Sequence, residues 1–149
     1  MNKAKLKVAI ILCILFFAMF GCDPQNDHFE IRPGIREYTP LMSSTPGIPL
    51  MAVFSNDNQN TGYIFHWITE EGILLDWHEK DGIGRIEQLG KDVRIDQRKI
   101  YWTVDFEKEI AGEEFEVSLF IERKDSGEVL QKTSITIVQK EKGWFFVKQ

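Results

Sequence analysis

Cysteine is almost absent from this chain of 149 residues. Its two cysteines, Cys13 and Cys22, both lie near the amino terminus, and none follows them. A disulfide framework, a cysteine-based zinc site, a CxxC redox motif and a cysteine nucleophile are therefore excluded beyond Cys22. A domain in that part of the chain must be stabilised by packing alone.

Proline is missing from the last 100 residues, and all five prolines lie between positions 24 and 49. Because proline fixes φ and lacks a backbone donor, such a stretch disfavours helices and central strands. We predict a proline-rich tether over residues 22–46, whose apolar part, residues 29–42, lies partly against the domain. The domain itself is predicted over residues 47–149.

Basic residues are also in deficit, with 18 lysines and arginines against 23 acidic residues. Three of the lysines, Lys3, Lys5 and Lys7, precede the first apolar run. Without them, 15 basic residues face 23 acidic ones, which gives a net charge of −8. This acidic balance predicts no nucleic-acid partner and no electrostatic docking to anionic lipid.

The chain has one long apolar run, the 13 residues 8–20. A membrane-spanning helix needs about 20 residues, whereas a secretory signal needs fewer. The three lysines before the run and the small residue Gly21 after it complete the layout of such a signal.

The end of this signal, Met19-Phe20-Gly21-Cys22, resembles a bacterial lipobox. The resemblance implies that residues 1–21 are a lipoprotein signal peptide and that the Cys22 thiol is diacylated. Two acyl chains suffice for stable membrane attachment. The expected location is the cell membrane, with the lipid-anchored chain facing the extracytoplasmic side.

The rest of the chain is typical of β-strands. Apolar and polar residues alternate with a period of two over residues 100–105 and 115–122, and Gly/Asp/Asn turns separate short segments. No apolar stripe with helical spacing persists for three turns. We therefore predict an all-β domain built as an antiparallel β-sandwich.

One late segment carries a family resemblance. Residues 115–138, FEVSLFIERKDSGEVLQKTSITIV, are similar to the late hairpin of bacterial immunoglobulin-like domains. In that family an alternating strand, a charged turn with glycine and a second strand close the sheet. The resemblance implies an immunoglobulin-like sandwich and says nothing about a ligand.

An earlier pair of segments predicts a second hairpin, with residues 63–69 and 73–79 flanking Glu70-Glu71-Gly72. Gly72 suits the positive-φ position of a three-residue loop. The resulting register places His66 opposite Asp76, with His78 diagonal to His66. Histidine and carboxylate ligands suit zinc, and histidine with open positions suits copper or iron. His66, Asp76 and His78 are candidate metal ligands, with an ordinary cross-strand polar pair as the alternative.

The aromatic residues allow two interpretations. Trp67, Trp77 and Trp102 alternate in phase with apolar neighbours, which predicts that they pack in the core. Tyr101 falls on the opposite face, with Thr103. If the aromatic side chains were exposed, they would instead form a stacking platform for glycans.

No catalytic signature is present: the chain lacks G-x-S-x-G, S-x-x-K, H-E-x-x-H and a glycine-rich phosphate loop. We expect no catalytic residues and no cofactor. The predicted function is that of a lipid-anchored, non-enzymatic surface protein, joined to the membrane by its anchor and binding an envelope protein or cell-wall polymer. Metal binding and glycan binding remain the alternatives.

Overall fold

The computed structural model describes residues 29–54, 62–80 and 83–148. This part of the chain is all-β, as predicted, and contains no helix that could cross a membrane. The predicted signal peptide and Cys22 lie outside the described residues. The strands are β1 Phe29–Pro33, β2 Glu37–Tyr38, β3 Ile48–Phe54, β4 Tyr63–Thr69, β5 Ile73–Lys80, β6 Ile83–Gly90, β7 Asp92–Ile95, β8 Lys99–Thr103, β9 Glu114–Arg123, β10 Val129–Glu141 and β11 Trp144–Val147.

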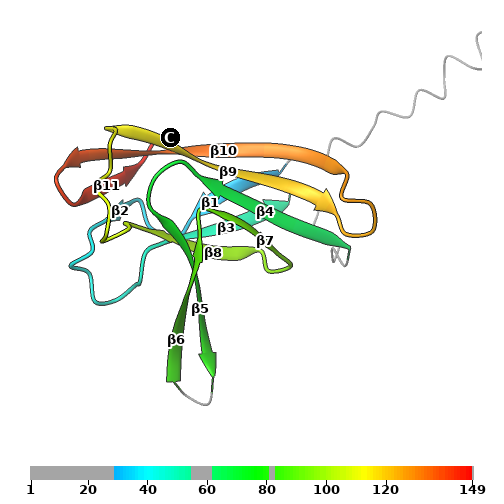
Figure 1. Cartoon of the computed structure of the whole chain (residues 1–149), viewed down its shortest axis with the longest axis horizontal. Coiled ribbons are helices and arrows are strands. Elements are labelled where there is room, and N and C mark those ends of the chain that lie inside the picture. Colours follow the sequence, from blue (N-terminus) through cyan, green and yellow to red (C-terminus); the bar gives the residue numbers. More distant parts are fainter. Residues whose placement is uncertain (1–28, 55–61, 81–82, 149) are drawn as a thin grey trace, which may run out of the picture.

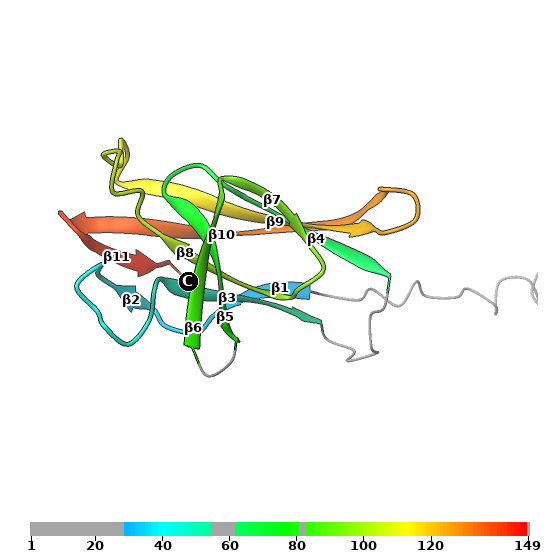
Figure 2. The same ribbon diagram turned by 60° about the horizontal axis from the view of Figure 1, so that its bottom comes forward.

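The strands form two stacked antiparallel sheets, as Figures 1 and 2 show. The five-stranded sheet has the order β1-β3-β8-β5-β6, and the six-stranded sheet has the order β2-β11-β10-β9-β4-β7. Seven of these strands follow the A-B-E-D and C-F-G order of constant-type immunoglobulin domains, with β1-β3-β8-β5 facing β4-β9-β10. The strands β2, β6, β7 and β11 extend the two sheets.

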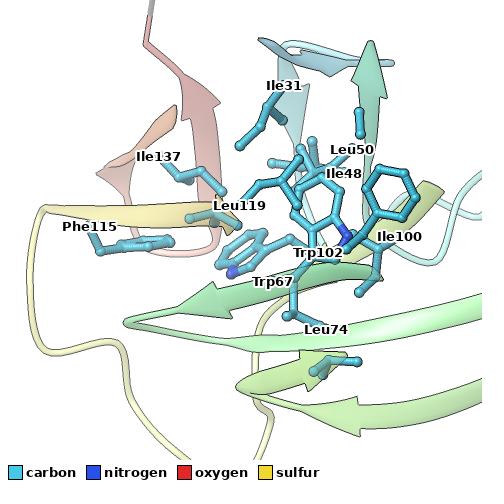
Figure 3. Packing of buried hydrophobic residues seen from close by; sticks show 14 of the residues in the cluster. Ile31, Ile48, Leu50, Trp67, Leu74, Ile100, Trp102, Phe115, Leu119 and Ile137 are labelled. Atoms are coloured by element: carbon cyan, nitrogen blue, oxygen red, sulfur yellow. The ribbon is translucent and has the colours of Figure 1, made fainter. Parts of the chain in front are cut away.

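The core lies between the sheets and is filled by alternating side chains from both inner faces (Figure 3). On β9 the apolar alternation predicted from the sequence is confirmed, because Phe115, Val117, Leu119 and Ile121 are all buried. The fully buried Trp102 packs against Phe115 and Phe145, with ring centroids 5.1 Å away in each case.

The connection between β4 and β5 differs from the predicted hairpin. β4 pairs with β7 and β9 in one sheet, whereas β5 pairs with β6 and β8 in the other. Residues 70–72 therefore cross between the sheets. Gly72 has the predicted positive φ, +71°, but its backbone packs against β8, where the Trp102 indole donates to the Glu71 carbonyl at 2.7 Å. A three-residue loop with a glycine can join two strands of one hairpin or two strands in different sheets. The local sequence therefore does not distinguish a hairpin from a crossing between the sheets.

The predicted tether also contains two strands. β1 pairs with β3 over five positions and buries Phe29 and Ile31, and β2 buries Tyr38. Within the described residues the sandwich therefore includes the chain from Phe29 on, and the predicted domain boundary at residue 47 is too late. The prolines did not prevent this, because β1 is an edge strand and Pro33 is its last residue.

Candidate functional site

The three predicted metal ligands do not form one cluster. His66 lies on β4 in the six-stranded sheet, whereas Asp76 and His78 lie on β5 in the five-stranded sheet. His78 Nδ1 is 3.0 Å from Asp76 Oδ2, so these two form a pair on the projecting part of β5. Among the described residues, no group of three or more histidine, cysteine or acidic side chains is arranged to hold a metal ion.

His66 is buried instead in a network on the outer face of the six-stranded sheet. Its Nδ1 lies 2.7 Å from Glu122 Oε1, and its Nε2 lies 2.8 Å from Asp92 Oδ1. The Phe120 ring packs against the imidazole at 5.4 Å, and Arg94 Nε donates to Glu122 Oε2 at 3.1 Å. Both imidazole nitrogens are therefore engaged by carboxylates within the sheet.

Electrostatics keep the Glu122 carboxylate ionised in this network. Burial by itself raises the pKa of Glu122, but hydrogen bonds from Arg94 and His66 and the charges of both residues outweigh burial and lower it. The network joins β4, β7 and β9, because His66 bonds to Asp92 and Glu122 and Arg94 forms an ion pair with Glu122. We infer that this network stabilises the pairing of β4 with β7 and β9.

The tryptophans divide between core and surface. Trp67 and Trp102 are fully buried, as predicted, but Trp77 is 40% exposed, so its predicted core position is wrong. Tyr101, predicted to face away from the core, does so but is buried beneath Trp77, with ring centroids 5.5 Å apart. The cause is the register of β5. Leu74 pairs with Trp102 and faces the core, whereas Leu75 pairs with Tyr101, so Trp77 lies two residues further along the outer face.

The feature best suited to binding is a groove at one end of the sandwich, which we call the far-end groove. It has a volume of about 410 Å³ and is formed by the loops 39–47 and 104–113 and the turn 142–143. Its apolar lining includes Val104, Phe106, Ile110 and Phe145. The charged residues at this groove are Asp105, Lys108, Glu109 and Lys142.

Two large apolar side chains project from the loops of the far-end groove. Leu41 is 90% exposed and Phe106 is 78% exposed, the highest values among the large apolar residues described. The backbone N–H of Met42 donates to the Thr39 carbonyl at 2.9 Å, which closes the turn that carries Leu41. The Glu107 N–H donates to the Asp105 carboxylate at 3.1 Å, which fixes the turn that carries Phe106.

The far-end groove lies opposite the end at which the chain enters the sandwich. β1 starts at Phe29, which pairs with Phe54, and the Phe54 ring stacks on Tyr63 at 6.2 Å. Tyr63 pairs with Arg123, next to the β9–β10 turn. Figures 1 and 2 show this turn and the β10–β11 turn at opposite ends of the sandwich. Phe29 and the far-end groove are therefore separated by the length of the strands.

A second and larger depression, of about 870 Å³, runs between β1 and the strands β10 and β11. Its lining mixes polar and apolar residues, and two of its cations have partners: Arg32 bonds to Glu30 at 2.7 Å, and Lys148 bonds to Glu114 at 3.0 Å. These internal ion pairs lower its capacity to bind an anion.

Sequence reasoning found neither depression. The available signal was the presence of Leu41 and Phe106 next to turn-forming residues, Pro40 and Asp105. Apolar residues at such positions cannot be explained by core packing and so indicate a contact surface.

No protein-family model, no curated protein and no solved structure matches this chain. Its function must therefore be argued from its own residues and their geometry.

Proposed function

We propose that this chain is a lipid-anchored, non-enzymatic protein of the bacterial cell surface that binds an envelope protein in its far-end groove. The observation that carries the proposal is the exposure of Phe106, which lines an apolar groove, and of Leu41, which follows the lining residue Pro40. Exposed large apolar side chains around a concave surface are typical of protein interaction sites.

The anchor supports this orientation. The lipobox places the lipid on Cys22, and only seven positions separate Cys22 from Phe29, the first residue of β1. A chain of that length spans at most about 25 Å. The Phe29 end of the sandwich then stays near the bilayer, and the far-end groove points away from it.

The composition of the groove favours a protein as the partner. Val104, Ile110 and Phe145 provide apolar lining, while charged residues such as Lys108 and Glu109 border it. An apolar centre within a polar rim is the usual anatomy of a protein–protein interface. An apolar side chain of the partner would insert into the groove beside Phe106.

The experiment is crosslinking of the tagged full-length protein in cells that express it, followed by purification and identification of bound proteins. The Phe106→Asp variant places a charge at the groove, and we expect it to lose the enriched partner. Val129→Asp is the matched control, because Val129 is also exposed but lies at the start of β10, near the anchored end. Equal partner recovery from both variants would contradict the proposal.

Glycan binding remains a second candidate, supported by the exposure of Trp77 over Tyr101. A sugar ring stacked on Trp77 would change the tryptophan fluorescence of the wild type, and Trp77→Leu would abolish that change. No change with saturating cell-wall fragments would remove this candidate.

A further inference from the structure

We propose that two copies of this chain pair antiparallel along β6 and thereby join their five-stranded sheets into one continuous sheet. This inference does not rest on the far-end groove or on the identity of its partner. It rests on the unpaired edge of β6, on the projection of the β5–β6 ribbon and on the order of charges along the strand.

β6 is an edge strand of eight residues whose ladder in the described structure is with β5 alone. Because the β5–β8 ladder ends at the Leu75–Tyr101 pair, the ribbon beyond it consists of two strands and projects from the sandwich (Figure 1). An isolated two-stranded ribbon is marginally stable in water, and an unpaired edge is a template for another strand.

The side chains of the ribbon alternate between an apolar and a charged face. Ile86 pairs with Trp77 on one face, and both are exposed, Ile86 by 58%. On the other face Arg85 pairs with His78, and Glu87 pairs with Asp76. Glu87 thus lies opposite a like charge, which weakens a cross-strand pair.

The side chains of Arg85 and Glu87 are both exposed, and neither side chain forms a hydrogen bond or ion pair with another described residue. Their positions make β6 complementary to itself. In an antiparallel pairing with its two-fold axis at Ile86, Arg85 of each copy lies opposite Glu87 of the other copy. The arrangement therefore forms two oppositely charged pairs and brings a cation beside each Asp76–Glu87 pair.

The same register also brings the apolar side chains of the two copies together. Ile86 lies opposite Ile86 of the second copy, with a Trp77 flanking it on each side. These side chains then contact one another along the sheet and lose part of their exposed surface. A shift of the pairing by one residue would lose both the charge pairs and this apolar row.

Charge reversal in the full-length chain tests the pairing. Two copies with different carboxyl-terminal tags are co-expressed, and recovery of one tag with the other is measured. We expect Arg85→Glu in both copies, or Glu87→Arg in both, to lower recovery at least about tenfold, because two attractive pairs become repulsive. One Arg85→Glu copy with one Glu87→Arg copy restores both attractive pairs, so recovery should return. Lys124→Glu, at the β9–β10 turn, is the charge-matched control and should have no effect.

A crosslink at the two-fold axis gives an independent readout. Ile86→Cys in the full-length chain should form a covalent dimer with a short bifunctional thiol reagent, whereas the parent chain and Lys124→Cys should not. Adding Arg85→Glu should remove the dimer. An absence of dimer in the Ile86→Cys chain, or no rescue by the mixed reversal pair, would overturn the proposal. Loss of the groove partner in Phe106→Asp would leave these results unchanged, so the two proposals fail separately.

Discussion

The two fully buried tryptophans should respond differently to the same substitution. The Trp102 indole N–H donates to the Glu71 carbonyl at 2.7 Å, whereas the Trp67 indole N–H is buried without a hydrogen-bond partner among the described residues (Figure 3). Replacing either by phenylalanine removes a similar volume from the core. The difference between the unfolding free energies of Trp67→Phe and Trp102→Phe therefore measures the effect of the Trp102–Glu71 hydrogen bond.

The magnitude follows from the cost of burying polar groups. Trp102→Phe loses this hydrogen bond, although the Glu71 carbonyl still accepts from the Thr69 hydroxyl at 2.6 Å, and the loss adds about 1 kcal/mol to the packing loss. Trp67→Phe removes an unsatisfied buried N–H, which offsets the packing loss by a similar amount. We expect Trp102→Phe to lower the free energy of unfolding by about 2 kcal/mol more than Trp67→Phe.

Urea unfolding followed by far-UV circular dichroism measures this difference without depending on tryptophan emission. Equal m-values would show that both variants unfold from a comparable structure. If Trp67→Phe destabilised the protein as much as Trp102→Phe, the assignment of one satisfied and one unsatisfied indole would be refuted.

Three further predictions concern other parts of the chain. The folded-state pKa of Glu122 is lowered below its ordinary value of 4.5, so the stability it contributes is present above pH 4.5 and lost as the pH falls through the folded pKa. The difference in unfolding free energy between wild type and Glu122→Gln should therefore shrink from pH 7 to pH 3, and a constant difference would contradict the network. Gly72→Ala should lower the free energy of unfolding by about 3 kcal/mol or more, because Gly72 has φ +71° and a Cβ there would collide with the Thr103 carbonyl. A decrease below about 1 kcal/mol in a urea titration would contradict this geometry. Cys22→Ala should leave the chain uncleaved or mislocalised, and normal processing with membrane retention in cell fractionation would refute the lipoprotein proposal.

The parts of the fold that depend on local signals were predictable. The β9–β10 hairpin has strict alternation on β9 and a turn with a glycine, Gly127, at φ +70°. Both strands lie next to each other in sequence and in the sheet, so their pairing requires no knowledge of the rest of the chain. The absence of helical periodicity likewise predicted the all-β class.

The parts that depend on competition between distant segments were not predictable. β4 pairs with β9, about 50 residues away, because the sandwich offers β4 a buried position between β7 and β9. The predicted pairing with β5 also produced the false proximity of His66 and Asp76.

The candidate site was missed for a related reason. Leu41 and Phe106 are more than 60 residues apart in sequence, and only the stacking of the two sheets brings their loops to one end. The sequence also did not predict that β1 is an edge strand. Proline occurs both at the ends of edge strands and in linkers, so Pro33 does not distinguish the two.

The most direct test of the proposed function is site-specific photo-crosslinking in intact cells, comparing full-length chains that carry the photoreactive residue at position 106 or at position 125. Position 106 lies at the far-end groove, and Asp125 lies in the β9–β10 turn near the anchored end. We expect a discrete protein adduct from position 106 that is lost when Ile110→Asp is added, and no such adduct from position 125. The same adduct from both positions, or one insensitive to Ile110→Asp, would contradict binding in the far-end groove.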